Sequence, residues 1–464
     1  MRRPLRSVVG YLVIAVMVAS MGMGMGGVPS GARGEAKCPV RALDRATKPV
    51  EITFWHVQTA KNEEVLQELV ARFEAHQDRV RVKLVNQVTY PDLFNKYRAG
   101  LTTGALPDVA EMNVAYLQAL VDSRSVVPIE ACASTDNYEQ SDYVPQAIDA
   151  YTLKGVQWAM PWTVTGRVLL YDRNVFRAAG LDPDDPPATL DEVIEDSRRI
   201  VERGASRHGI ALPTDPGLLP HLYTKSGQLY VNHHNGRTVR ATKTLLNSQI
   251  GRHIWTWWDD IVESGLGIST GRATTDHLLA VANRDAAMTI DSSNVVGPVF
   301  DVLSSGEFAH VDPGVAPLPA ANPAGGVMVS GGSLWLPRAS KPDKQAAAWE
   351  FVKFLSEPDQ QAAYTVGTRG GYLPIRRSAS HDPELQQMWQ QDPRTRVPYD
   401  QLLSGPTNRV TPGPVLGDPD GVGDAVVDAL TGMLAGDLNP KNALRQAQHD
   451  ADAALAEYNR RVGT

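Results

Sequence analysis

The alternation of strand-like and helix-like segments predicts an α/β fold with mostly parallel sheets. From residue 50 onward, short segments of alternating hydrophobicity are followed by segments whose apolar residues recur at helical spacing. Such an order places helices on both faces of a sheet. The chain has 464 residues, of which 42% are hydrophobic. This length is too great for one core, so we expect two or three domains.

The first part of the chain carries the clearest alternation. Apolar residues between 62 and 76 recur at spacings of three and four, which is typical of a helix with one buried face. The expected elements are, in order, a strand at 50–55, a helix at 62–76, a strand at 80–85, a helix at 92–101 and a strand at 108–113.

A second unit is expected to begin near Pro161. Thr189, followed three residues later by Glu192, has the spacing of a capping box and predicts the start of a helix. The other expected elements are strands at 168–171, 286–290 and 332–336, helices at 173–179, 254–261 and 343–355, loops at 317–326 and 404–414, and a mainly helical C-terminal part. Two of the three tryptophans at 255, 257 and 258 are expected in the core.

The N-terminus has the three parts of a secretory signal peptide. Arg2, Arg3 and Arg6 form a basic head, residues 8–20 are almost all apolar, and small residues follow up to Ala36. The alternative is an uncleaved membrane anchor, because the apolar stretch approaches the length that spans a bilayer. Either interpretation places the rest of the chain outside the cytoplasm.

Composition excludes some classes of partner and predicts a disulfide. A formal net charge of −7, with no cluster of basic residues, argues against a nucleic-acid partner. Cys38 and Cys132 are the only two cysteines, and two cysteines in an exported chain are expected to pair. A metal site would need more Cys or His nearby, so we expect none.

The sequence contains no recognised catalytic motif. It has no Gly-x-Ser-x-Gly, no phosphate-cradling Gly-rich loop before a helix and no His-Glu-x-x-His. His233 and His234 are adjacent within a polar stretch, which favours a surface turn over a metal site. Asp418 and Asp420 are expected to be solvated surface charges. We therefore expect no catalytic residue and no cofactor, although the carboxylates of glycoside-cleaving enzymes can lie far apart in sequence.

Polar and aromatic residues gather where the expected strands end. Open α/β sheets bind ligands outside the carboxyl ends of their strands. Aromatic faces together with hydroxyl and carboxylate groups suit a polyol or a sugar. The candidate ligand-binding residues are Tyr90, Glu111, Asn113, Trp162, Thr163, Thr165, Ser292, Ser293 and Gly332.

These candidates also have structural interpretations. The alternative interpretation of Tyr90 is a residue that packs against a loop, and that of Trp162 is a core residue. The two serines would suit the start of a helix. Glu111, expected at a strand end facing an open cleft, would alternatively form an ion pair with a nearby base such as Arg98.

Residues 161–176, PWTVTGRVLLYDRNVF, resemble the signature of the family 1 extracellular solute-binding proteins of ABC importers. Further segments agree with that family in the same order along the chain: FWH at 54–56, LPDV at 106–109, AGLDP at 179–183, AAMTI at 286–290, GGSLW at 331–335 and GYLPI at 371–375. The resemblance implies a two-domain clamp of the periplasmic-binding-protein type, type II, with the ligand cleft between the domains. It implies domain one at 38–160 plus 322–372 and domain two at 161–321 plus 373–464.

The resemblance is strongest to binders of glycerol 3-phosphate, glycerophosphodiesters, sugars and amino sugars. The Arg that holds phosphate in the glycerol-3-phosphate binders would fall near Tyr399, where no Arg stands. Tyr399 is included among the candidate ligand-binding residues. A Trp expected near residues 217–219 is also absent. These departures favour a neutral sugar, an amino sugar or a phosphodiester.

The implied function is capture of the ligand by hinge closure and delivery to a membrane permease, by a monomer. The alternatives are a secreted carbohydrate-active enzyme and a sugar-sensing binding module.

Overall fold

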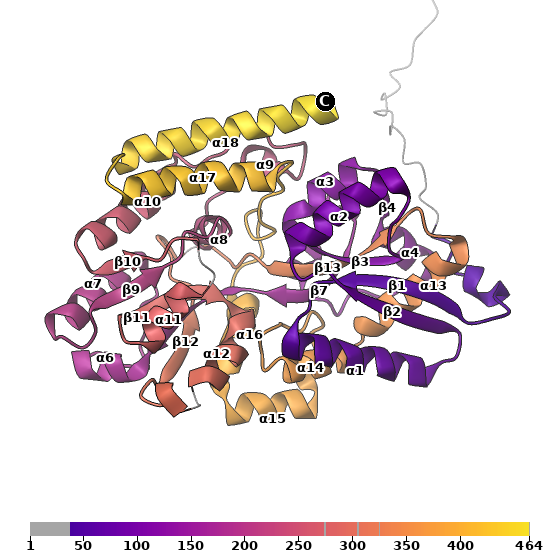
Figure 1. The fold of residues 1–464 in the computed structure, drawn as a ribbon, viewed down its shortest axis with the longest axis horizontal. Helices are drawn as coiled ribbons and strands as arrows, with labels where there is room; N and C mark the ends of the chain where they lie inside the picture. The colour runs from indigo at the N-terminus through magenta and orange to yellow at the C-terminus, as the bar shows by residue number, and fades with distance from the viewer. Residues whose placement is uncertain (1–37, 273–274, 304–305, 324, 464) are drawn as a thin grey trace, which may run out of the picture. The chain divides into compact units, whose positions relative to one another are not determined.

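A computed structural model describes residues 38–272, 275–303, 306–323 and 325–463. The expected signal peptide, residues 1–36, lies outside the described residues. Residues 37–464 form one compact unit. Within it, two β-sheets with their covering helices form two lobes. In Figure 1 the first lobe combines indigo and violet segments with the orange segments at 330–391, and the second lobe contains magenta segments and the yellow C-terminal helices.

The first lobe is built on a six-stranded sheet in the order β2-β1-β3-β13-β4, with β7 also paired to β13. Its strands are β1 (Val50–His56), β2 (Val80–Asn86), β3 (Val109–Asn113), β4 (Val126–Val127), β7 (Met160–Thr165) and β13 (Ser330–Pro337). Strand β1 runs parallel to β2 and β3, while β13 runs antiparallel to β3, β4 and β7. Among the described strands of this sheet, only β13 therefore runs opposite to the others.

Helices cover both faces of this sheet. They are α1 (Ala60–His76), α2 (Tyr90–Thr103), α3 (Leu117–Asp122), α4 (Ile129–Asp136), α5 (Pro145–Ala150), α13 (Pro342–Leu355), α14 (Pro358–Gly367) and α15 (Pro383–Gln391), with a small hairpin of β5 (Thr152–Leu153) and β6 (Val156–Gln157). The core between them includes Ile52, Phe54, Leu66 and Trp349, all fully buried.

The second lobe is built on a five-stranded sheet in the order β10-β9-β11-β8-β12. Its strands are β8 (Arg167–Asp172), β9 (His208–Leu212), β10 (Gly267–Ser269), β11 (Ala286–Ser292) and β12 (Pro313–Pro317). Strand β9 is parallel to β10 and β11, and β8 is antiparallel to β11 and β12. One reversed strand in each of these two sheets makes both of them mixed: the other strands run in one direction, but only four of the nine strand pairings are parallel, fewer than the prediction of mostly parallel sheets implied.

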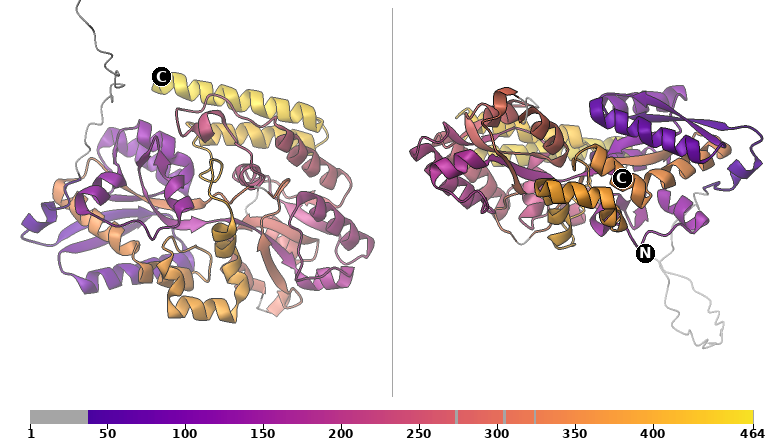
Figure 2. Two further views of the ribbon diagram at one scale, coloured as in Figure 1. Left: turned by 180° about the vertical axis from the view of Figure 1, so that it is seen from behind. Right: turned by 90° about the horizontal axis from the view of Figure 1, so that it is seen from below.

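The helices of the second lobe include two long ones at the C-terminus. They are α6 (Arg173–Ala179), α7 (Leu190–Glu202), α8 (Leu218–Lys225), α9 (Asn232–Gly236), α10 (Gln249–Glu263), α11 (Asp276–Ala282), α12 (Val296–Leu303), α16 (Val397–Ser404), α17 (Pro419–Leu434) and α18 (Pro440–Val462). The views in Figures 1 and 2 show α17 and α18, in yellow, packed along one another. All three tryptophans of α10 are buried in the core of this lobe.

Local sequence signals explain several element boundaries. Thr189 accepts a hydrogen bond from Glu192 N, and the Glu192 carboxylate accepts from Thr189 N, so the predicted capping box is confirmed. Gly180 ends α6 in the left-handed conformation at φ 76°. Among the described residues, no helix is both long and apolar enough to cross a membrane.

The predicted disulfide is confirmed between Cys38 and Cys132. It joins the start of the described chain to α4, across a sequence separation of 94 residues. Both half-cystines are buried in the core of the first lobe. Because the bridge closes a long loop, it restricts the unfolded chain as well as fixing the N-terminal segment.

We expect the bridge to contribute about 2–5 kcal/mol to the free energy of unfolding. Unfolded, unreduced protein should show no free thiol in a thiol titration, and a Cys38→Ser/Cys132→Ser double variant should melt at a lower temperature. The wild type melted in reductant serves as the matched control, because it lacks the bridge without a substitution. Two titratable thiols would contradict the prediction.

Candidate functional site

Three strands of the first lobe bring the predicted site residues to one place. Strand β13 lies between β3 and β7, and its register pairs Gly332 with Asn113 on one side and with Thr163 on the other. A bulge in the β13/β7 pairing follows Gly332 directly. Residues far apart in the sequence therefore become neighbours because both outer strands pair with β13.

Glu111 lies at the centre of this arrangement, with four donors on its carboxylate. Oε1 accepts hydrogen bonds from Gln58 Nε2 at 2.6 Å, Thr163 Oγ1 at 2.8 Å and Tyr90 OH at 3.0 Å. Oε2 accepts from Val57 N at 3.1 Å. The carboxylate thus joins the segment after β1, the start of α2 and strand β7 to strand β3.

The hydrogen-bond network continues behind Gln58 into the first lobe. Tyr364 OH donates to Gln58 Oε1 at 2.8 Å, and the ring of Tyr364 packs against Tyr372 with centroids 5.5 Å apart. We call Gln58, Tyr90, Glu111, Thr163 and Tyr364 the carboxylate cluster. All but Tyr90, which is half-buried, are buried.

Burial raises the pKa of Glu111 above its ordinary value of 4.5, and the four hydrogen bonds act in the opposite direction without cancelling the effect. The expectation that Glu111 faces an open cleft is wrong for this structure, because its exposed fraction is 0%. The alternative of an ion pair with Arg98 is also wrong, since the hydrogen-bond donors to Glu111 come from other residues. The guanidinium of Arg98 lies 5.9 Å from the Phe94 ring centroid.

Gly332 allows the carboxylate cluster to close. A Cβ at this position would lie 2.5 Å from both Glu111 Oε1 and Thr163 Oγ1 and 2.6 Å from Tyr90 OH. Gly332 N also donates to Thr163 Oγ1 at 3.0 Å. Tyr90, Glu111, Thr163 and Gly332 are therefore brought together, as four of the candidate residues.

Two further candidates lie close to the crossing between the lobes. Ser293 is buried, accepts from Gly166 N at 3.3 Å and donates to Gly371 O at 2.8 Å. A short 3-10 helix begins at Ser293 with Ser292 in the N-cap position, but the Ser292 side chain makes no capping hydrogen bond, so the serines mark the helix start without capping it. Thr165 is buried and pairs with Ser330 across β7 and β13.

The remaining candidates have different surroundings. Trp162 is 1% exposed and packs edge-on against Phe54, so it is a core residue of the first lobe. Tyr399 is buried on α16 and stacks on Trp389 with ring centroids 5.3 Å apart, outside the carboxylate cluster. Both side chains serve packing in this structure, since aromatic pairs at this distance are favourable beyond their buried area.

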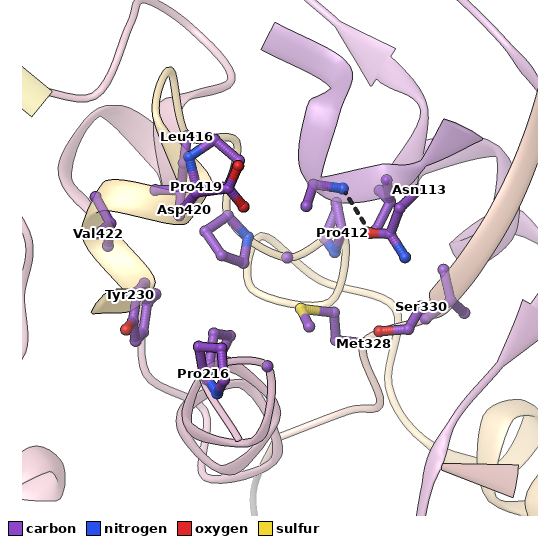
Figure 3. Close-up of a pocket in the computed structure, with 18 residues that line it drawn as sticks. Asn113, Pro216, Tyr230, Met328, Ser330, Pro412, Leu416, Pro419, Asp420 and Val422 are labelled. Carbon is purple, nitrogen blue, oxygen red and sulfur yellow. Dashed lines mark hydrogen bonds between the residues drawn. The ribbon is translucent and has the colours of Figure 1, made fainter. Parts of the chain in front are cut away.

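Asn113 lines a hollow of about 820 Å³, part of it open to solvent, which we call the central hollow (Figure 3). Asn113 accepts from Ala115 N at 2.9 Å, the dashed contact in the figure. The walls of the central hollow come from the end of β3, the starts of α8, β13 and α17, Tyr230 and the loop 412–416. Both lobes therefore contribute to it.

The walls of the central hollow are mainly apolar. They include five prolines, at 216, 220, 412, 414 and 419, as well as Met328 and Tyr230. Asp420 is the only acidic or basic residue among the described residues that line it. Burial, and then the neighbouring Asp418 and Asp424, raise the pKa of Asp420. Asp420 is exposed, as expected for a surface charge, and it also lines this hollow.

A second, charged hollow lies at the carboxyl ends of β9 and β11. Arg167 contacts the carboxylates of both Asp215 and Asp291, the latter at 3.3 Å. His277 Nε2 lies 2.8 Å from the other oxygen of Asp291. Ser292 lines this hollow together with these four residues.

The Arg167 guanidinium determines the electrostatics of the charged hollow. Burial acts to raise the pKa of Asp215, but Arg167 and the N–H of Gly217 outweigh it and the pKa is lowered. A guanidinium already held by two carboxylates is less available to a ligand anion. Arg272, also on this wall, pairs with Asp424 at 2.7 Å.

Sequence reasoning missed several residues of these sites. Gln58 and Tyr364 give no periodic or motif signal, because their partners come from distant segments. Arg167 lies two residues after the end of β7, at the start of β8, a position that could have drawn attention. No group of three or more metal-ligating side chains occurs in the described part of the chain, and His233 and His234 are exposed in a turn, as expected.

Replacing Glu111 by Gln should lower the free energy of unfolding by about 1–3 kcal/mol, because the amide group cannot accept from all four buried donors. The pH dependence gives a second readout. A raised folded-state pKa stabilises the protein below pH 4.5 and loses that stabilisation as the pH rises through the folded-state value.

The stability gap between wild type and Glu111→Gln should therefore shrink as the pH rises above 4.5 and through the folded-state pKa, as measured by chemical unfolding curves. Glu64→Gln, which changes an exposed carboxylate on α1, is the control and should show no such trend. A gap that widens with pH would mean that the carboxylate is ionised and stabilising, contrary to the prediction.

Comparisons with known proteins agree with this architecture. Residues 68–395 match the family described as bacterial extracellular solute-binding protein. The sn-glycerol-3-phosphate-binding periplasmic protein UgpB of Brucella abortus is 24% identical over 419 residues, covering 89% of this chain and 94% of the relative. The protein of the same name from Yersinia enterocolitica is 25% identical, covering 88% and 93%.

Solved structures share the fold at low sequence identity. UgpB from Mycobacterium tuberculosis in complex with glycerophosphocholine has a TM-score of 0.73 at 19% identity and covers 89% of this chain and 99% of that one. The sugar-binding protein MalE from Xanthomonas citri has a TM-score of 0.74 at 21% identity and covers 89% and 98%. These likenesses confirm the predicted two-domain solute-binding fold.

The family match covers more than two thirds of the chain, and the family is one of binding proteins rather than enzymes. Its description as extracellular agrees with the predicted export. The chain belongs to the bacterial extracellular solute-binding proteins.

Proposed function

We propose that this protein is the substrate-binding component of an ABC importer and holds its ligand between the two lobes. The observation that carries the proposal is the central hollow, whose walls come from both lobes of a chain in the solute-binding family. A ligand that contacts both walls stabilises the arrangement in which they are close, which is the physical basis of hinge closure.

The proposed domains follow the ranges expected from the resemblance, 38–160 plus 322–372 and 161–321 plus 373–464. The strand pairing supports one adjustment. Strand β7 belongs to the six-stranded sheet, and β8 belongs to the other sheet. The first crossing is therefore better placed at Gly166, between these strands.

We propose a neutral sugar, an amino sugar or a glycerophosphodiester as the ligand. Two observations argue against a phosphate monoester, which carries nearly two negative charges. The described lining of the central hollow contains no Lys or Arg. In the charged hollow, Arg167 and Arg272 are already paired with carboxylates. Strong phosphate binding needs charge-assisted donors, and these are occupied.

The names of the solved structures support this range of ligands, because they refer to glycerophosphocholine and to sugars. The names of the curated relatives refer to glycerol 3-phosphate, which the charge argument disfavours here. Within the site, we propose that Asn113 in the central hollow, Ser292 in the charged hollow and the half-buried Tyr90 supply polar contacts. The buried members of the carboxylate cluster, like Trp162 and Tyr399, would act by supporting the wall.

Export and assembly complete the proposal. We propose that residues 1–36 direct the chain across the membrane, by cleavage or as an anchor. The mature protein would then act as a monomer that delivers its ligand to a permease.

A ligand panel tests the proposed chemistry. Calorimetric titration with maltose, glucosamine, glycerophosphocholine and glycerol 3-phosphate should show binding of at least one of the first three. Glycerol 3-phosphate should bind at least about tenfold more weakly than the best of them, a difference of about 1.4 kcal/mol. Tighter binding of glycerol 3-phosphate would sink the charge argument.

Asp420 allows the panel to separate cationic from neutral ligands. Asp420→Asn should weaken a ligand that carries an ammonium group and leave a neutral sugar unchanged, because only the former gains from the carboxylate. Asp428→Asn, further along α17 and outside the hollow's lining, makes the same charge change and is the matched control.

Closure has its own test. Small-angle scattering at saturating ligand should give a smaller radius of gyration than the ligand-free protein, because a bridging ligand brings the lobes together. Size-exclusion with light scattering on the same samples checks the expected monomer. An unchanged radius with a proven ligand would speak against a clamp.

A further inference from the structure

The turn before Arg237 has an unusual backbone. His233, His234 and Asn235 have φ values of 54°, 54° and 58°, so three successive residues with side chains lie in the left-handed region. This conformation is disfavoured for residues with a Cβ, so it must be held in place by the surroundings. Asn235 Oδ1 accepts from Tyr230 N at 2.8 Å and Val231 N at 3.1 Å, which stabilises this turn from within.

Arg237 follows the turn, and all five of its guanidinium N–H groups have backbone carbonyl acceptors. Nη1 donates to Asp149 O at 2.9 Å and Thr152 O at 2.8 Å, and Nη2 donates to Ala150 O at 3.2 Å. The other two bonds, from Nη2 to Pro412 O and from Nε to Gly413 O, reach a different segment.

The first three acceptors lie at the C-terminal end of α5 and just beyond it, in the first lobe. Carbonyls at a helix end lack intrahelical partners and carry partial negative charge, so a cation is favourable there. Ala147 and Ala150 of α5 are fully buried in the core of that lobe. Arg237 is therefore attached to a rigid part of the first lobe.

The other acceptors belong to the loop 412–416, which lines the central hollow. The turn holds this loop by a further bond, from Val415 N to Asn235 O at 2.8 Å. The approach is close, since a Cβ on Gly236 would lie 2.4 Å from Val415 O. Tyr230, whose N–H is bonded to Asn235, lines the same hollow.

We infer that Arg237 is a positioning residue for ligand capture, which fixes the hollow-lining loop 412–416 and the turn after Tyr230 to helix α5 of the opposite lobe. The shape of the hollow and the placement of the lobes then change together. The effect on ligand rests on the proposed function of the central hollow, whereas the attachment of the loop does not.

The five carbonyl acceptors of Arg237 distinguish a positioning role from a general contribution to stability. The five bonds all go to carbonyls, whose positions are set by the backbone, so the planar guanidinium fixes the geometry of three segments at once. An ammonium group has three N–H groups at one point and cannot reproduce the fork. Arg240, three residues on, makes a different contact, an ion pair with Asp122 at 2.7 Å.

Arg240 provides the matched control, because its partner Asp122 belongs to the first lobe but does not line the central hollow. The experiment compares hydrogen–deuterium exchange of the ligand-free mature wild type with Arg237→Gln, Arg237→Lys and Arg240→Gln. Circular dichroism first establishes that each variant is folded, and Arg237→Lys keeps the charge in case Arg237→Gln is too unstable.

Peptides covering residues 412–416 should exchange at least about tenfold faster in the Arg237 variants and stay close to wild type in Arg240→Gln. Maltose and glycerophosphocholine are the binding probes, and the dissociation rate of whichever binds should rise at least about tenfold in the same two variants. A lower melting temperature alone would be a structural effect and would not count as support.

Unchanged exchange at 412–416 in a folded Arg237 variant, or equal acceleration in Arg240→Gln, would overturn the inference. An unchanged dissociation rate with accelerated exchange would overturn its link to capture. If neither probe binds the wild type, the proposed ligand class fails, while the exchange result still decides whether Arg237 holds the loop.

Discussion

The buried carboxylate of Glu111 is the constraint on which the first lobe's side of the cleft depends. Removing a carboxylate from water is costly unless its oxygens accept several hydrogen bonds. Here four donors come from the β1/α1 connection, the start of α2 and strand β7. The need to satisfy one group thus fixes how three separate segments meet at the edge of the sheet, next to the hollow that both lobes line.

The same constraint explains why strand order matters more than any single residue. Thr163 can reach Glu111 only because β13 runs between their strands with a glycine at the point of contact. A side chain at 332 would separate Glu111 from Thr163 and Tyr90. The polar site is therefore a product of the reversed strand β13, which returns from late in the sequence to join strands formed much earlier.

Much of the fold could be predicted from sequence because its signals are local. The alternation at 50–113, the capping box at Thr189 and the apolar face of α10 each depend on neighbouring residues. Tyr90, Glu111 and Thr163 were predicted because strand ends collect ligands in open sheets. The burial of Glu111 and its partnership with Gln58 could not be predicted, because they depend on segments between 21 and 54 residues away in the sequence.

Arg237 makes two groups of hydrogen bonds, one to the end of α5 and just beyond it and one to the loop that lines the central hollow. Which group breaks first affects how the two lobes can separate. Arg237 gives two of its bonds to α5, one to Thr152 just beyond it and two to the loop 412–413, so an opening of the proposed clamp that separates these segments must break one group or the other. Water can replace each lost carbonyl, so the net cost is modest, about 1.5–3 kcal/mol for each bond from a charged donor. These bonds favour the closed arrangement, and a ligand that contacts both walls shifts the population further toward it. Breaking the bonds to the loop would also remove part of the hollow's wall, whereas breaking those to α5 would leave that wall intact. Opening that releases α5 therefore keeps half of the site formed for the next ligand.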